Sequence, residues 1–172
     1  MDKAQFWQLI EDAHAKSAGD CDTQADLVEA ALLKLEPEEI IGFDRILDDL
    51  RDAAFRWDLW GAAYLINGGC SDDCFVYFGC WLIMQGQEVY TNAVKDPDSL
   101  ADVIEPDFAE AECEPLLYAA DHAYKQKTQQ VIPRPGPAGT KWKEDELDAM
   151  FPKITAKINS LYGEADDEQT MC

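Results

Sequence analysis

The sequence predicts an all-α fold: a single-domain bundle of several helices around a central apolar helix at about residues 72–86. Apolar residues recur every three or four positions over long stretches, and no stretch alternates strongly between polar and apolar residues. Helix-capping residues stand at the ends of several of these stretches. The 172 residues, 47% of them apolar, suffice for one domain with its own core. We expect this domain to cover residues 1–163 and a flexible acidic tail to follow at 164–172.

The first part of the chain predicts two helices. Asp2 can cap the first helix, because Gln5 stands where the third residue of a capping box belongs. That helix ends near Ser17–Gly19. The second helix begins at Asp22 or Thr23, and its leucine and alanine residues then recur every four positions.

A third helix begins at Pro37, a residue suited to the first helical turn. Its apolar residues form a seam with alternating spacings of three and four: Ile40, Phe43, Leu47, Leu50, Ala54, Trp57, Gly61 and Tyr64. The helix ends at Asn67-Gly68-Gly69, because glycine readily adopts the left-handed conformation that closes a helix. The pattern therefore predicts one continuous helix from Pro37 to about Asn67.

The most apolar stretch is CFVYFGCWLIM, residues 74–84. Ser71 can cap a helix here, and Asp72 and Asp73 fall in its first turn, where the helix dipole favours negative charge. A strand is the alternative, because Phe, Val, Tyr and Trp favour sheets. The length of the stretch and the caps favour a helix, and a helix that is apolar all round belongs at the centre of the domain.

The rest of the chain predicts short helices with irregular connections. In order, these are a helix from Asp96-Pro97 to Val103, an acidic irregular segment over 104–114, a helix from Pro115, a proline-rich surface loop over 133–139, and two closing helices between Lys143 and Tyr162 that Pro152 separates.

Charge and hydropathy narrow the classes of function. The chain has 35 Asp and Glu residues against 14 Lys and Arg residues, a formal net charge of -21. Such a charge repels nucleic acids and anionic membranes, so we expect neither as a direct partner. No stretch approaches the ~20 apolar residues that span a bilayer. The first residues, MDKAQFWQLIED, lack the pattern of a secretory signal, so we expect a cytoplasmic protein.

The six cysteines are Cys21, Cys70, Cys74, Cys80, Cys113 and Cys172. Their spacings are irregular, and a chain of this size does not need disulfides to build a core. No CxxC motif occurs, and His14 and His122 are the only histidines, so the pattern is a poor match to a zinc site. We expect buried, reduced thiols.

Residues 56–90 contain the candidate functional residues, gathered around one turn between two helices. The candidate ligand-binding residues are Trp57, Asp58, Trp60, Asn67, Gly68, Gly69, Cys70, Ser71, Asp72, Asp73, Tyr77 and Trp81. The aromatic residues could line a pocket, although their helical spacing also fits a core. Asp72 and Asp73 could bind a hard divalent cation such as Mg²⁺ or Ca²⁺, because the neighbouring glycines would let backbone carbonyls approach. The simpler alternative is that both carboxylates only stabilise the helix N-terminus.

Motifs within this segment and on either side of it carry a resemblance to a known family. The matching residues are Phe6-Trp7, Leu9-Ile10, the segment WDLWGAAY at 57–64, GGCSDD at 68–73, Trp81-Leu82-Ile83, Gly86 and DPDSL at 96–100. On these motifs the chain resembles an uncharacterised bacterial family, domain of unknown function 4240, which implies no reaction. The resemblance implies an arginine after Phe78, where this chain has Gly79. If that arginine pairs with Asp72 or Asp73, the partner is missing in this chain or comes from elsewhere, such as Arg56.

Two functions are consistent with these observations. The sequence has no recognisable catalytic set, which favours a small acidic binding or regulatory protein of the adaptor or immunity kind, with a protein partner that is basic. We expect no cofactor in that case. The alternative is an enzyme, or a small-ligand or metal-binding protein, with its site at the Asn67–Asp73 turn.

Overall fold

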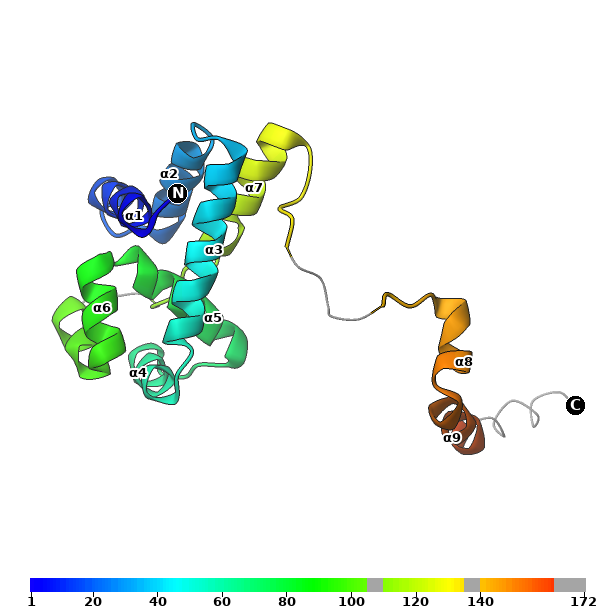
Figure 1. Cartoon of the computed structure of the whole chain (residues 1–172). Coiled ribbons are helices and arrows are strands. Elements are labelled where there is room, and N and C mark those ends of the chain that lie inside the picture. The colour runs from blue at the N-terminus through cyan, green and yellow to red at the C-terminus, as the bar shows by residue number, and fades with distance from the viewer. Residues whose placement is uncertain (105–109, 135–139, 163–172) are drawn as a thin grey trace, which may run out of the picture. The chain divides into compact units, whose positions relative to one another are not determined.

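The computed structural model describes residues 1–104, 110–134 and 140–162, and every regular element in these ranges is a helix. The chain divides into two compact units, Met1–Pro133 and Arg134–Cys172. The helices of the first unit are α1 (Lys3–Ser17), α2 (Cys21–Leu32), α3 (Pro37–Ala54), α4 (Trp57–Asn67), α5 (Asp72–Met84), α6 (Gln87–Lys95), the 3-10 helix η1 (Pro97–Val103) and α7 (Leu116–Thr128) (Figure 1). The all-α prediction is therefore confirmed.

Helix α5 lies at the centre of the first unit, as the sequence predicts. It packs against α1, α2, α3, α4, α6 and α7. Every residue from Phe78 to Met84 is buried, whereas the first turns of the helix are partly exposed. The hydroxyl of Ser71 caps the helix by accepting a hydrogen bond from the backbone N–H of Cys74 at 3.2 Å. The strand alternative for this stretch is thereby ruled out.

Helices α1 and α2 begin at carboxylate caps. Asp2 and Gln5 form the predicted capping box at the start of α1. Helix α2 starts earlier than predicted, because Asp20 rather than a later residue caps it and accepts a hydrogen bond from the N–H of Thr23 at 2.8 Å.

The prediction of one continuous helix from Pro37 to Asn67 is wrong, because the chain leaves the helical conformation at Phe55 and Arg56. The Arg56 guanidinium ion-pairs with Asp58 and donates a hydrogen bond to the backbone carbonyl of Val94 at 2.9 Å. This contact joins the break to the end of α6, 38 residues away. The apolar spacing continues across the break, so periodicity alone does not reveal it.

Helix α6 is not among the helices that the sequence predicts. It begins after Gly86, which has a φ of +94° and turns the chain between α5 and α6. The Tyr90 side chain anchors it, because its hydroxyl donates a hydrogen bond to the backbone carbonyl of Leu50 in α3 at 2.7 Å.

The expectation that the cysteines are all reduced is wrong. Cys21 and Cys113 form a disulfide that links the start of α2 to the segment before α7, with a Cα–Cα distance of 5.7 Å. The two residues are 92 positions apart, and only the packing of α2 against α7 brings them together. Cys80 is a buried free thiol, while Cys70 and Cys74 are free and partly exposed. Cys172 lies outside the described residues.

The second unit contains η2 (Glu144–Glu146), α8 (Leu147–Met150) and α9 (Pro152–Tyr162). The break before Pro152 agrees with the two closing helices expected there. None of these three helices has a buried residue. The chain thus divides after residue 133, whereas the sequence predicts one domain to residue 163. The expected tail over 164–172 lies outside the described residues.

In the described part of the chain, no helix has both the length and the apolar character that crossing a membrane requires.

Candidate functional site

The turn between α4 and α5 is built around two glycines. Gly68 has a φ of +69° and closes α4, and Gly69 has a φ of +152°. The N–H of Gly69 donates a hydrogen bond to the carbonyl of Tyr64 at 2.9 Å. From the other side, the indole Nε1 of Trp60 donates to the carbonyl of Cys70 at 3.0 Å. The turn is therefore fixed to α4 by both backbone and side-chain hydrogen bonds.

Asp72 and Asp73 lie exposed in the first turn of α5, next to the Ser71 cap. Acidic residues stabilise this position through the partial positive charge of the helix N-terminus. Over residues 1–104, 110–134 and 140–162, no group of three or more His, Cys, Asp or Glu side chains is placed to hold a metal ion. The geometry fits helix stabilisation, and a cation at these two carboxylates stays a prediction.

Asn67 connects the turn to the acidic segment before α7. Its Oδ1 accepts a hydrogen bond from the N–H of Ala111 at 2.9 Å. Two residues further on, the N–H of Cys113 donates to the backbone carbonyl of Tyr77 at 3.0 Å. Tyr77 thus contributes its backbone to this contact. Sequence reasoning missed both contacts, because Asn67 and Ala111 are 44 residues apart.

The Cys70 thiol is not activated as a nucleophile. Burial, and then the neighbouring Cys74 and Glu112, raise the pKa of the Cys70 thiol. A thiol reacts as its thiolate, so a raised pKa lowers its reactivity at neutral pH. This argues against covalent catalysis at the turn.

Five aromatic residues of α4 and α5 form one continuous row. Its members are Trp57, Trp60, Phe75, Phe78 and Trp81, with successive ring centroids 5.4, 4.7, 5.8 and 5.5 Å apart. The row runs from Trp57, which is 85% exposed, to Trp81, which is 6% exposed. The predicted tryptophans are therefore brought together, but as a packed row from the core to the surface.

The outer end of this row lies on an exposed apolar surface. We name the surface formed by Phe55, Trp57, Tyr64 and Leu65 the α4 face; all four side chains are exposed, Leu65 by 83%. Phe55 packs against Trp60 and Phe75, with ring centroids 6.1 and 5.7 Å apart. Sequence reasoning missed Phe55 and Leu65, because neither belongs to the apolar seam on which it relied.

A groove of about 430 Å³ adjoins the α4 face, between α4 and η1. Its walls are mainly apolar, and its lining residues are Asp58, Gly61, Ala62, Leu65, Ile66, Pro97, Asp98, Leu100, Ala101 and Ile104. Leu65 belongs to both the groove and the α4 face, so the two meet at this side chain.

Acidic residues dominate the sequence around this surface. Between Asp48 and Glu114 the chain has 15 acidic residues and three basic ones. Two of these three bases, Arg51 and Arg56, form ion pairs with Asp48 and Asp58. The hydrogen bonds from Arg56 hold the pKa of the Asp58 carboxyl below its usual range, so it is ionised at neutral pH. Arg56 thus contacts Asp58 and Val94 rather than Asp72 or Asp73.

Gly79, where the family resemblance implies an arginine, lies beneath Arg51. A Cβ at this position would be 3.9 Å from Cγ of Arg51. A hollow of about 50 Å³ opens beside it, between α3 and α5. The Arg51 side chain thus extends from α3 to the surface of α5 at Gly79.

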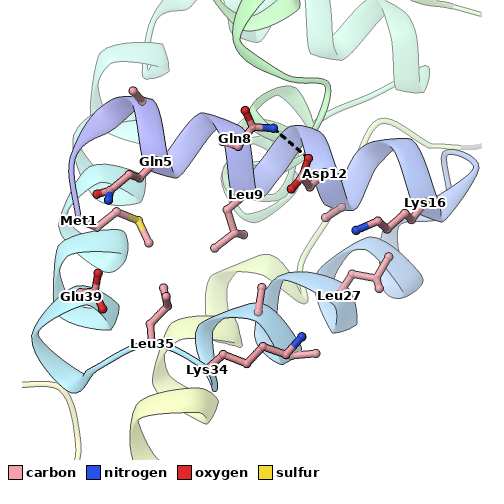
Figure 2. Close-up of a pocket in the computed structure, with 14 residues that line it drawn as sticks. Met1, Gln5, Gln8, Leu9, Asp12, Lys16, Leu27, Lys34, Leu35 and Glu39 are labelled. Atoms are coloured by element: carbon pink, nitrogen blue, oxygen red, sulfur yellow. Dashed lines mark hydrogen bonds between the residues drawn. The ribbon is translucent and has the colours of Figure 1, made fainter.

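A second hollow, which sequence reasoning missed, lies between α1, α2 and the start of α3. We name it the α1–α2 groove; it has a volume of about 650 Å³ and an apolar centre (Figure 2). Leu9 points into it from α1, and Leu27 and Leu35 line it from the opposite side. Its only signal in the sequence is the apolar spacing that it shares with any core-facing helix.

Comparison with known proteins gives one match. The model of the family described as "Protein of unknown function (DUF4240)" matches residues 1–126, which include the turn, the α4 face and the α1–α2 groove. No curated protein and no solved structure matches the chain. Because the match covers most of the chain, the protein belongs to the DUF4240 family, whose function is unknown.

Proposed function

We propose that this protein is a binding or regulatory protein that recognises a protein partner through the α4 face. The observation that carries the proposal is the exposure of Phe55, Trp57, Tyr64 and Leu65 within eleven residues of one helix and its N-terminal flank. Clustered large apolar side chains on a surface mark interaction sites more often than scattered ones do.

The side chains of the α4 face have the character of interface anchors. Tryptophan and tyrosine are over-represented among the few residues that carry most of the energy of an interface. Trp57 stacks on Trp60 with an interplanar angle of 12°, and Trp60 stacks in turn on the buried Phe75. The exposed indole is therefore held by the core and would lose little conformational entropy on binding.

Charge indicates the kind of partner. The part of the α4 face around Tyr64 and Leu65 is uncharged, since no Lys, Arg, Asp or Glu occurs between Leu59 and Ser71, whereas the exposed Arg56–Asp58 ion pair flanks Trp57. The acidic residues around it would attract a surface with an apolar centre and a basic rim, and would steer its approach. These features together favour an adaptor- or immunity-like role in the cytoplasm, with a basic protein as the partner.

The proposal is tested by affinity purification from extract of the source cells. We expect wild-type protein to retain a basic partner that the Trp57→Ala/Leu65→Ala variant loses, because the variant removes two anchors. The retained partner should elute as salt rises, since salt screens the acidic border. Direct titration of the purified partner then gives the loss of affinity, which we expect to exceed about 2 kcal/mol.

The matched control is Tyr118→Ala/Val131→Ala, which removes two exposed apolar side chains away from α4. It should retain the partner like the wild type. If wild type and the Trp57→Ala/Leu65→Ala variant retain the same proteins, the α4 face is not the binding surface and the proposal fails.

A further inference from the structure

We propose that the α1–α2 groove binds a single-chain amphiphile with an anionic head group, of the class of long-chain carboxylates. This site is separate from the α4 face, because none of its lining residues belongs to α4 or α5. The inference does not depend on the proposed function.

The apolar centre of the groove would hold the alkyl chain. Met1, Leu9, Leu27 and Leu35 are each partly buried: they pack against the core on one side and are open to the groove on the other. Around them both helices carry alanines, at Ala4 and Ala13 in α1 and at Ala30 and Ala31 in α2. These small side chains leave space that leucines would fill. The resulting volume of about 650 Å³ is within the usual range for small-ligand sites.

Two lysines on opposite walls of the groove would bind the head group. Lys16 extends from α1 and Lys34 from the turn after α2 (Figure 2). In the described ranges neither ammonium group has a hydrogen bond or an ion pair, although the chain has 35 carboxylates and 14 Lys and Arg residues. Two cations without a carboxylate partner, beside an apolar groove, form a site for an amphiphile that carries a negative charge.

The two carboxylates on the groove are already bound to their neighbours. Oδ1 of Asp12 accepts a hydrogen bond from Nε2 of Gln8 at 2.9 Å, which Figure 2 shows as a dashed line. Oε2 of Glu39 accepts one from the N–H of Glu36 at 3.1 Å, as part of the capping box of α3. Within the described ranges the two lysines, by contrast, have no such bond, which favours an anionic over a cationic head group.

Titration calorimetry with sodium laurate, below the concentration at which it forms micelles, tests the proposal. We expect one laurate to bind per chain. Sodium decanoate, two methylenes shorter, should bind more weakly by about fourfold for each methylene that leaves the groove. Dodecyltrimethylammonium has a chain of the same length and the opposite charge, and we expect it to bind at least tenfold more weakly than laurate.

Two lysine variants that remove the same charge distinguish binding of laurate in the groove from general electrostatic attraction between laurate and the protein. Lys16→Gln/Lys34→Gln should weaken laurate binding at least tenfold, whereas Lys3→Gln/Lys95→Gln, at two exposed lysines outside the groove, should leave it unchanged. The Trp57→Ala/Leu65→Ala variant should bind laurate like the wild type, so failure of the proposed function would leave this result intact. Equal affinity for laurate and dodecyltrimethylammonium, equal affinity of the two lysine variants, or no binding of laurate would each overturn the proposal.

Discussion

The indole nitrogen of Trp60 and the backbone carbonyl of Cys70 are 3.0 Å apart and form the hydrogen bond that ties the α4–α5 turn to α4. Trp60 also stacks on Phe75 in α5 and on Trp57 at the surface. One side chain thus joins the glycine turn, the aromatic row and the α4 face, so the exposed anchors of the proposed interface depend on a partly buried contact.

Trp60→Phe should lower the free energy of unfolding by about 1–2 kcal/mol, because the ring is largely kept while the Cys70 carbonyl loses its donor. Urea unfolding followed by circular dichroism measures the change. Trp57→Phe is the matched control, since the Trp57 ring is exposed, and it should alter stability by less than about 0.5 kcal/mol. Equal effects of the two substitutions would contradict a structural role for the Trp60–Cys70 hydrogen bond.

The Cys21–Cys113 disulfide should contribute strongly to stability, since it closes a loop of 92 residues. We expect Cys21→Ser/Cys113→Ser to lower the free energy of unfolding by about 4 kcal/mol, chiefly because the unfolded chain regains the freedom that the crosslink removes. Urea unfolding under non-reducing conditions gives the value. Cys70→Ser/Cys74→Ser replaces two free thiols and should have little effect.

The redox state of Cys21 and Cys113 in the cell tests the predicted cytoplasmic location of the protein. Disulfides persist in oxidising compartments, whereas cytosolic thiols are kept reduced. The disulfide therefore argues against the cytoplasmic location, which stays a prediction. Acid quenching of source cells, followed by alkylation and mass spectrometry of Cys21 and Cys113, reports the redox state. A fully oxidised pair would contradict a cytoplasmic location.

Tyr90 should make stability depend on pH in the alkaline range. Burial raises the pKa of its hydroxyl to about 12, above the ordinary value of 10 for an unfolded chain. The neutral hydroxyl is thus favoured in the folded state, so its contribution is complete below pH 10 and is lost as pH rises from about 10 to about 12.

Urea unfolding from pH 8 to pH 12 measures this loss. Tyr90→Phe should lack this component of the pH dependence and should be less stable at pH 8 by about 1 kcal/mol, because the hydrogen bond to Leu50 is gone. Tyr64→Phe, at an exposed tyrosine, should follow the wild-type profile. Identical profiles of wild type and Tyr90→Phe would show that Tyr90 does not titrate as a buried group.

Ser71 and the two aspartates after it distinguish a helix cap from a metal site. Ser71→Ala should lower stability by about 1 kcal/mol, because the N–H of Cys74 loses its acceptor. Asp72→Asn/Asp73→Asn should cost about 0.3–1 kcal/mol per carboxylate through the helix dipole. Thermal unfolding with Mg²⁺, Ca²⁺, Mn²⁺ and Zn²⁺ completes the test: a stabilisation seen in wild type and lost in Asp72→Asn/Asp73→Asn would establish a cation site instead.

The sequence by itself determined the elements whose signals are local. The caps at Asp2 and Ser71, the start of α3 at Pro37 and the apolar run of α5 each depend on residues within about four positions, which is the range of helical hydrogen bonds and side-chain contacts. The family resemblance also followed from contiguous motifs, and the match over residues 1–126 confirms it.

Only the tertiary structure decided which apolar residues are covered and where distant segments meet. Trp57 and Trp81 are both tryptophans at helical spacing, yet one is exposed and the other buried, because only Trp81 lies where the other helices surround α5. The break at Arg56 and the Cys21–Cys113 bond depend on residues 38 and 92 positions away. The physical reason is that periodicity records which residues are apolar, whereas burial depends on the partners that long-range packing brings to each face.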